Sequence, residues 1–507
     1  MQGPGRPKLL SMAALLAVTA AAGLAGCDGQ GEPESSADVP VHARAADVPR
    51  YAEPTPPRSR RSGAIRGVLS QLPGAKGCWV AKAAGGCRVY RMPARSNPAG
   101  IRLDRVAALI VSPDGRNVYA AANPYTNLIA GFTRARDGAL APIAGNAGCV
   151  AVGSPRCEPP IYRQRQLSAL AISPDGRNLY AAADYTYVQA VQAFTRISGG
   201  ALRNARRGIS CAGSRGRVLA ADRRNRCRLT TKLGNPTDLV VGPGGRELYV
   251  AADNGVALLR RTPSGGIYVA GCLGSPGERV RNVACEVARG VDRASDIAIA
   301  PGGRNVYVAS SQGLAVFARD TRDGTLTQLA GPAGCVVETR TSDCALGRSL
   351  ARPSEPVRGG GNQVAVSPDG RNVYVGARNG IAAFSRDPRT GALTQLPGSA
   401  ACIAQAPQTD CTPGRALQSI EGLVVSPDGA NVYAAAHGSR AVAVLERTAS
   451  GALTQSAGTS ACINSDASNG CAPARAIGAA TAVAIDPAGR AVYVSSYDAG
   501  LAVFARR

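Results

Sequence analysis

One short pattern of apolar and polar positions recurs along the chain. An apolar run is followed by Ser-Pro-Asp-Gly or a close variant, and then by a run such as Asn-Val-Tyr-Ala-Ala, as in residues 112–121. Pro and Gly favour a tight turn, and β-branched and aromatic residues favour strands. The pattern therefore predicts two strands joined by a turn. It occurs seven times at intervals of 58 to 69 residues, with its proline at Pro113, Pro174, Pro243, Pro301, Pro368, Pro427 and Pro487.

Each repeat contains two further apolar segments. Residues 313–319 illustrate the third predicted strand, and residues 324–329 illustrate the fourth, which begins with Gly-x-Leu. No stretch between the strands shows the 3.6-residue periodicity of a helix, which argues against a parallel α/β architecture. Four strands in about 60 residues is the size of a propeller blade. We therefore expect an all-β, seven-bladed β-propeller of four-stranded blades.

The two ends of the repeat region complement each other. A fourth strand and a cysteine follow the third strand in six repeats, but the seventh repeat stops after its third strand at 501–504. The missing copy stands at 67–78, which matches 391–402 almost position by position. We expect this N-terminal strand to complete the last blade of a propeller that spans 62–507. A ring closed in this way leaves no long exposed strand edge.

The amino terminus carries an export signal. Arg6 and Lys8 precede an apolar run over 9–26 that ends in Leu-Ala-Gly-Cys, an arrangement typical of secretion signals. The last four residues resemble the lipobox of bacterial lipoproteins, which implies acylation (a palmitate) at Cys27 and membrane anchoring outside the cytoplasm. An ordinary signal peptide or an uncleaved anchor is the alternative. We expect a signal peptide over 1–26 and a lipidated disordered tether over 27–61.

The remaining fourteen of the fifteen cysteines fall in sequential pairs. Each pair lies between a fourth strand and the next first strand, and its members are 8 to 16 residues apart. Zinc sites favour ligands two to four residues apart, so metal binding is disfavoured. An exported chain meets an oxidising compartment, and we expect disulfides. The pairs are Cys78/Cys87, Cys149/Cys157, Cys211/Cys227, Cys272/Cys285, Cys335/Cys344, Cys402/Cys411 and Cys462/Cys471.

The formal net charge is +24, and all but four of the 58 basic residues are arginine. These arginines are scattered along the repeats, and aromatic residues make up only 4% of the chain. Stacking aromatics and clustered charge are typical of nucleic-acid binding, so we expect no nucleic-acid partner. Phosphate, calcium and zinc motifs are missing from the sequence, which predicts neither a cofactor nor a metal. We expect a monomer.

Candidate functional residues follow from the expected blade geometry. The loops between second and third strands should surround one mouth of the central channel, beside the starts of the innermost strands. Carboxylates, an imidazole and a guanidinium there could support acid–base chemistry and stabilise an oxyanion, although wet mouths and turn caps also favour polar residues. Loop positions are Asn123, Asp184, Asp253, Ser311, Arg378, His437 and Tyr497, and inner-strand positions are Ser168, Asp238, Asp296, Gln363, Glu421 and Thr481.

Residues 367–377 followed by Gly-Ala-Leu-Thr at 391–394 resemble the lactonase-type propellers, a group that includes 6-phosphogluconolactonase-like and carboxymuconate-cyclising enzymes and YVTN-repeat surface proteins. The resemblance implies this fold. Its catalytic members use His, Glu and Arg at the mouth, the residue types of His437, Glu421 and Arg378, with Asp238 and Asp296 as further candidates. The first hypothesis is an extracytoplasmic, lipid-anchored scaffold that binds an unidentified ligand or protein. The alternative is a lactonase-like hydrolase or isomerase.

Overall fold

The described structure belongs to one compact unit of the chain. The chain divides into Met1–Arg58 and Ser59–Arg507. The described residues begin at 67, so the predicted signal peptide, Cys27 and the predicted tether over 27–61 lie outside them. The computed structural model describes residues 67–92, 101–122, 128–160, 166–183, 189–205, 211–213, 227–230, 232–275, 285–339, 343–350, 362–405 and 410–507.

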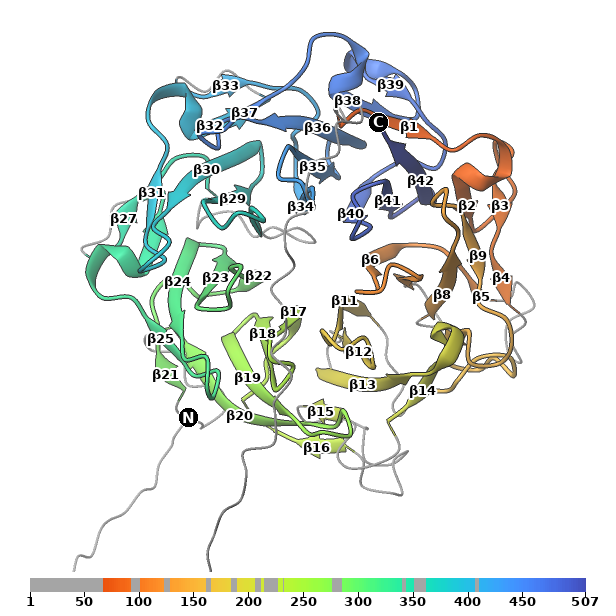
Figure 1. Cartoon of the computed structure of the whole chain (residues 1–507), viewed down its shortest axis with the longest axis horizontal. Coiled ribbons are helices and arrows are strands. Elements are labelled where there is room, and N and C mark those ends of the chain that lie inside the picture. Colours follow the sequence, from red (N-terminus) through yellow and green to blue (C-terminus); the bar gives the residue numbers. More distant parts are fainter. Residues whose placement is uncertain are drawn as a thin grey trace, which may run out of the picture. The chain divides into compact units, whose positions relative to one another are not determined.

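Seven small sheets form a ring around a central axis (Figure 1). The first three strands of each sheet run antiparallel from the channel outwards, as β22, β23 and β24 do in blade 4. The expected all-β, seven-bladed β-propeller is confirmed. We number the blades 1 to 7 in the order of their innermost strands along the chain. These strands are β6 (Val106–Val111), β11 (Leu167–Ile172), β17 (Pro236–Val241), β22 (Ala294–Ile299), β28 (Gln363–Val366), β34 (Ile420–Val425) and β40 (Ala480–Ile485).

The second strands carry the repeated Asn-Val-Tyr pattern, and every residue in them is buried. Neighbouring blades cover both faces of these strands, so the apolar residues run without alternation. These strands are β7 (Asn117–Ala122), β12 (Asn178–Ala183), β18 (Glu247–Ala252), β23 (Asn305–Ser310), β29 (Asn372–Gly376), β35 (Asn431–Ala436) and β41 (Ala491–Ser496). The third strands are β8 (Leu128–Arg134), β13 (Ala190–Arg196), β19 (Gly255–Arg261), β24 (Gly313–Arg319), β30 (Gly380–Arg386), β36 (Ala441–Arg447) and β42 (Gly500–Arg506).

The fourth strand differs from the expectation because it is divided in six blades. In blade 4 a short 3-10 turn, η3 (Gly331–Gly334), separates the two pieces, and Gly331 has a φ of +55°. A positive φ interrupts the ladder at this point. The pieces are β9 (Leu140–Pro142) and β10 (Cys149–Val150), β14 (Leu202–Asn204) and β15 (Cys211–Gly213), β25 (Leu326–Gln328) and β26 (Cys335–Val337), β31 (Leu393–Gln395) and β32 (Cys402–Ala404), β37 (Leu453–Thr454) and β38 (Cys462–Asn464), and β1 (Leu69–Gln71) and β2 (Cys78–Val80); β20 (Ile267–Gly274) is continuous.

A short outermost strand, which the sequence did not reveal, follows the second cysteine in six blades and pairs in parallel with the fourth strand. These strands are β3 (Arg88–Val89), β16 (Cys227–Leu229), β21 (Glu286–Val287), β27 (Ala345–Leu346), β33 (Thr412–Pro413) and β39 (Ala472–Pro473). The other short elements are β4 (Arg91–Met92), β5 (Ile101–Arg102), η1 (Gly74–Gly77), η2 (Ser198–Gly200), η4 (Gly398–Ala401), η5 (Thr459–Ala461) and η6 (Ser468–Gly470).

The N-terminal strand closes the ring as predicted. Both β1 and β2 pair with β42, the third strand of blade 7, in antiparallel register. In Figure 1 the first described strand, in orange-red, accordingly lies beside the dark blue C-terminal strand. The two ends of the propeller are thus held together by main-chain hydrogen bonds, and blade 7 has the same strands as its neighbours.

A tyrosine, an arginine and a glycine connect each blade to the next. The tyrosine of each second strand donates its hydroxyl hydrogen to a glycine carbonyl in the following blade, and it accepts a hydrogen bond from the Nε of that blade's third-strand arginine. The distances are 2.5 to 3.2 Å. The seven sets are Tyr119–Arg196–Gly200, Tyr180–Arg261–Gly265, Tyr249–Arg319–Gly324, Tyr307–Arg386–Gly391, Tyr374–Arg447–Gly451, Tyr433–Arg506–Gly67 and Tyr493–Arg134–Gly138.

Six of these arginines also form a salt bridge with an acid at or just after the Ser-Pro-Asp-Gly turn of the preceding blade. The repeated turn therefore serves as an inter-blade anchor as well as a strand connection. In blade 4 the turn is Pro301-Gly302-Gly303, which has no acid. Arg386 keeps the 2.6 Å hydrogen bond to Asn305 Oδ1, which four other arginines make to the equivalent asparagine. The acids are Asp114, Asp175, Glu247, Asp369, Asp428 and Asp486.

Disulfides fasten the loops that join consecutive blades. Six predicted pairs are formed, with Cα–Cα distances of 4.7 to 4.9 Å: Cys78–Cys87, Cys149–Cys157, Cys272–Cys285, Cys335–Cys344, Cys402–Cys411 and Cys462–Cys471. Cys211 is also disulfide-bonded. Its predicted partner Cys227 lies opposite it in the β15–β16 register, and the side chain of Cys227 is outside the described residues.

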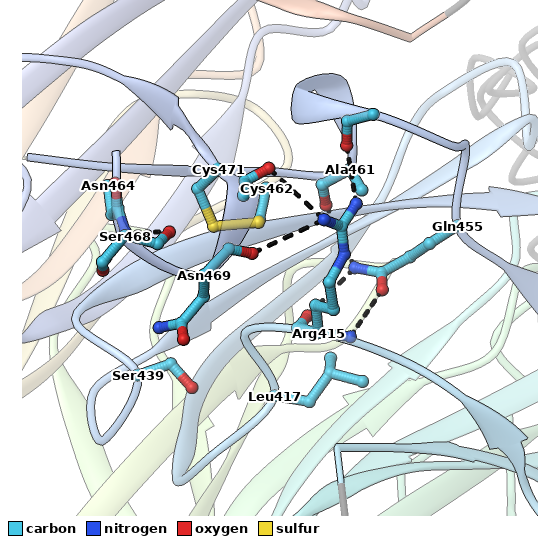
Figure 2. The surroundings of a disulfide bond; sticks show 12 residues. Arg415, Leu417, Ser439, Gln455, Ala461, Cys462, Asn464, Ser468, Asn469 and Cys471 are labelled. Carbon is cyan, nitrogen blue, oxygen red and sulfur yellow. Dashed lines mark hydrogen bonds between the residues drawn. A yellow bond between two sulfur atoms is a disulfide. The ribbon is translucent and has the colours of Figure 1, made fainter. Parts of the chain in front are cut away.

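Figure 2 shows how one of these loops is held. The Arg415 guanidinium donates to the Gly458 and Gly470 carbonyls beside the Cys462–Cys471 disulfide, and Gln455 exchanges two hydrogen bonds with the Arg415 main chain. Arg415 stands four residues after the second cysteine of the preceding blade, so the contact joins two blades. Gln328 with Arg289, Gln395 with Arg348 and Gln71 with Arg475 repeat the main-chain exchange.

We predict that Tyr433→Phe destabilises the closed ring by about 1–3 kcal/mol, because the Gly67 carbonyl and the Arg506 Nε each lose a buried partner. Urea unfolding measures this change. The matched control is Tyr268→Phe, since Tyr268 is 39% exposed and its substitution should have little effect. Equal stability of the two variants would contradict the role given to the tyrosine.

Candidate functional site

The innermost strands carry a repeated contact that makes one position unusual. Six of these strands have a β-bulge near their first residue. The residue inside the bulge is a serine or threonine in four of them, and its hydroxyl donates to a main-chain carbonyl of the next blade. The donors and acceptors are Ser168 with Pro236, Thr237 with Ala294, Ser295 with Asn362, and Thr481 with Val106.

In blade 6 the bulge holds Glu421 in place of a hydroxyl. Its side chain is 14% exposed, and burial raises the pKa of the carboxyl to about 8. Glu421 Oε1 lies 3.8 Å from Nδ1 of His437. A carboxyl that replaces a structural hydroxyl and meets an imidazole departs from the repeat, and such departures are typical of functional sites.

His437 follows β35 directly, at the start of the loop to β36. Its main-chain N–H donates to the Ser419 carbonyl at 2.9 Å, which fixes the loop beside the start of β34. Burial lowers the pKa of His437, and the Arg440 charge lowers it further, while Asp498 opposes the shift. At neutral pH the imidazole is therefore neutral and the Glu421 carboxyl is mostly protonated.

Residues of blades 7 and 1 complete the surroundings of His437. The Tyr497 ring lies edge-on to the imidazole with centroids 6.4 Å apart, and the Arg105 guanidinium lies 5.2 Å from the centre of the Tyr497 ring. Arg440 and Asp498 form a 2.7 Å ion pair. We call Glu421, His437, Tyr497, Arg105, Arg440 and Asp498 the His437 cluster. It combines an acid, a base, an exposed aromatic ring and guanidinium groups at one mouth of the channel.

Arg378 lies on the same rim. Its carbonyl accepts a 2.6 Å hydrogen bond from the Ser419 N–H, two residues before Glu421, and the residue is exposed. Thus three predicted residues, Glu421, His437 and Arg378, come from adjacent parts of blades 5 and 6.

Asp238 and Asp296 form a separate pair between blades 3 and 4. Asp238 Oδ2 accepts from the Ile297 N–H at 3.2 Å, and Asp296 Oδ2 accepts from the Val364 N–H at 2.7 Å. Burial and the neighbouring Asp296 raise the pKa of Asp238 well above its ordinary value. Each carboxyl thus binds the main chain of the next inner strand, which gives the pair a structural role.

The other predicted mouth residues have structural partners where the structure describes them. Asp253 accepts hydrogen bonds from both the main-chain and side-chain nitrogens of Asn235, and Ser311 donates to the Asp292 carbonyl. Asn123 and Asp184 lie outside the described residues.

Arg105, Arg440 and Asp498 were not predicted. The sequence contains a weak signal for Arg105, because Asp104-Arg105 recurs as Asp292-Arg293 before β22, and both arginines have a φ near +50°. Arg105 directly precedes β6, and its positive φ bends the chain at the start of this strand. Its main-chain N–H donates to the Tyr497 carbonyl.

Within the described ranges no group of three or more His, Cys, Asp or Glu residues could hold a metal ion. No described helix has the length and apolar character needed to span a bilayer.

No family model matches the sequence, and no curated protein matches it. Solved structures with a similar fold include a periplasmic gluconolactonase of Pseudomonas aeruginosa (18% identity, 75% of this chain and 93% of that chain, TM-score 0.47). Others are a candidate 6-phosphogluconolactonase of Bacteroides uniformis (17%, 70% and 85%, 0.46) and hydrazine synthase of Kuenenia stuttgartiensis (14%, 81% and 98%, 0.47). Lactonase-type propellers are thus among the structures that this chain resembles. At these identities the likeness concerns the fold.

The pKa of Glu421 predicts a pH dependence of stability. Between its ordinary value of 4.5 and about 8, the folded chain keeps a proton that the unfolded chain has released, so the free energy of unfolding falls as pH rises. The slope contributed by this group is at most about 1.4 kcal/mol per pH unit. Glu421→Gln should remove it, and urea unfolding of both proteins between pH 5 and pH 8 measures the difference. Parallel pH profiles would show that Glu421 ionises normally.

Proposed function

We propose that the protein is an extracytoplasmic hydrolase of lactones or similar cyclic esters, with His437 and Glu421 as its acid–base pair. The replacement of the inter-blade hydroxyl by Glu421, 3.8 Å from the histidine, carries the proposal. Burial of a carboxyl beside a neutral imidazole disfavours the ionised form of the carboxyl, so a purely structural role explains this residue poorly.

The protonation states fit this chemistry. A neutral His437 can take a proton from water as the water oxygen attacks the lactone carbonyl, and a protonated Glu421 can donate its proton to the departing ring oxygen. The acyl C–O bond breaks, and the product is a hydroxy acid. Arg378 and Arg105, which lie on the same rim, are the candidates to stabilise the oxyanion.

We predict that the purified protein opens simple lactones, and that His437→Ala and Glu421→Gln each lower kcat/KM by about 100-fold or more, the usual range for loss of a general acid or base. Proton release from γ-butyrolactone, δ-valerolactone and glucono-δ-lactone is the measurement. Asp323→Asn, at an exposed acid of the β24–β25 turn, is the control and should retain full activity. Absence of turnover across the panel, or equal rates for all variants, would remove the hydrolase proposal.

A binding scaffold is the second candidate. The observation that favours it is the Tyr497 ring, which is 44% exposed and carries the Arg105 guanidinium at 5.2 Å. Exposed aromatic and arginine pairs are common anchors in binding sites. Lactone binding without turnover that is lost in Tyr497→Ala and kept in His437→Ala would favour this function over hydrolysis.

The compartment follows from the disulfides. Disulfide-rich chains are typical of oxidising compartments outside the cytoplasm, and the six described disulfides accordingly indicate an extracytoplasmic protein. We further propose that Cys27 is acylated and holds the propeller at the membrane. Support comes from Leu-Ala-Gly-Cys at the end of the apolar segment.

We predict that Cys27→Ser moves the full-length protein from the membrane fraction to the soluble fraction of the producing cell. The reason is that the thiol of Cys27 is the acylation point of the proposed anchor. Fractionation with incorporation of labelled palmitate measures both anchoring and acylation. Equal membrane association of the variant and the original chain would point to an uncleaved apolar anchor.

A further inference from the structure

A pocket of about 740 Å³ lies between blade 7 and blade 1, on the face of the disulfide loops. It is within the size range of small-molecule sites. Its walls come from the Cys78–Cys87 loop, from the segments before β6 and before β40, and from the loop between β41 and β42. Much of the lining is small and apolar, including Ala81, Ala474, Ala476 and Ala499.

The pocket adjoins the His437 cluster through two pairs of consecutive residues. Asp498 lines the pocket and binds Arg440, while its neighbour Tyr497 faces the imidazole. Asp104 also lines the pocket, while its neighbour Arg105 stacks on Tyr497. The same two short segments therefore bound the pocket and the candidate acid–base site.

Two charged residues of the lining have no partner among the described residues. Asp104 is half-buried and accepts no hydrogen bond, and Lys82 at the rim donates none. The other cation of the lining, Arg475, is already occupied by the carbonyls of Leu72, Gly74 and Gly85. The Asp104 carboxylate can accept a hydrogen bond and the Lys82 ammonium can donate one, and the alanines form an apolar floor between the walls of the pocket. These groups match a ligand that has an N–H, a C=O and a short aliphatic part.

We propose that this pocket is the specificity pocket of the site and receives an acylamino side arm of the lactone substrate. The inference rests on the proposed hydrolase function and names its substrate class. The amide N–H of the side arm donates to Asp104, its carbonyl accepts from Lys82, and the acyl chain lies over the alanine floor. The lactone ring then extends past Asp498 towards His437 and Glu421.

Binding can be measured by fluorescence, because Trp79 is the only tryptophan of the chain. The His437→Ala variant is used so that the lactone is not hydrolysed during the titration. Trp79 is 6% exposed, directly precedes the pocket residue Val80, and has the Arg88 guanidinium 5.5 Å from its ring. Titration of full-length His437→Ala with α-butanoylamino-γ-butyrolactone should change the Trp79 fluorescence, and γ-butyrolactone should bind about tenfold more weakly because it lacks the amide.

The expected effect of Asp104→Ala in the same background is a loss of about tenfold in affinity for the acylamino lactone, with no change for γ-butyrolactone. Ala499→Leu, which fills the pocket, should act in the same way. Asp292→Ala is the matched control, since Asp292 precedes an arginine of the same conformation in blade 4.

The outcomes separate the two proposals. Asp104-dependent binding without any lactone turnover by the original chain would support the pocket and remove the hydrolase function. Lactone turnover with the same kcat/KM for both lactones, unchanged in Asp104→Ala, would overturn the pocket and leave the hydrolase function in place. Failure of the acylamino lactone to bind would also overturn the pocket.

Discussion

The hydrogen bonds of one tyrosine per blade are the constraint on which the propeller depends. Each hydroxyl joins an arginine and a glycine carbonyl of the next blade, and all seven tyrosines are fully buried. The two contacts fix the angle between neighbouring sheets, so the ring closes only when all junctions share that geometry. The glycine is part of the constraint, because a Cβ at Gly67 would lie 2.2 Å from the Asn431 side chain. Seven copies of Tyr, Arg and Gly therefore persist while the loops vary.

A strict repeat also shows where the chain departs from it. Gly302 stands where other blades have the turn acid, but Arg386 still donates to Asn305, so this departure costs little. Glu421 is different, because it stands where other blades have a hydroxyl that joins two blades, and it places a largely buried carboxyl next to an imidazole. The buried carboxyl of Glu421 lowers stability and makes no inter-blade hydrogen bond among the described residues, whereas the missing turn acid leaves Arg386 with a partner.

Local patterns in the sequence were sufficient for most of the fold. The Pro-Gly turns, the strand runs, the closing strand at 67–78 and the cysteine pairs are all visible in short stretches of chain. Contacts between blades were not visible, because the residues that meet are about 40 residues or more apart, as Arg415 and Gln455 are. The sequence therefore indicated Glu421, His437 and Arg378 only as rim residues. It could not indicate that Glu421 and His437 would meet, or that Arg105 and Asp498 would join them from other blades.

The energetics of Glu421 favour chemistry over packing as its role. A pKa of about 8 in place of 4.5 means that ionising this carboxyl in the folded chain costs several kcal/mol more than in water. The ring tolerates this because the tyrosine contacts and the hydroxyls of four other blades hold the inner strands without it. At the equivalent position of those four blades a hydroxyl makes the inter-blade bond and carries no ionisation penalty. Blade 6 is therefore less stable than it would be with a hydroxyl at this position. In exchange, Glu421 is a protonated acid beside the neutral base His437 at the mouth of the channel.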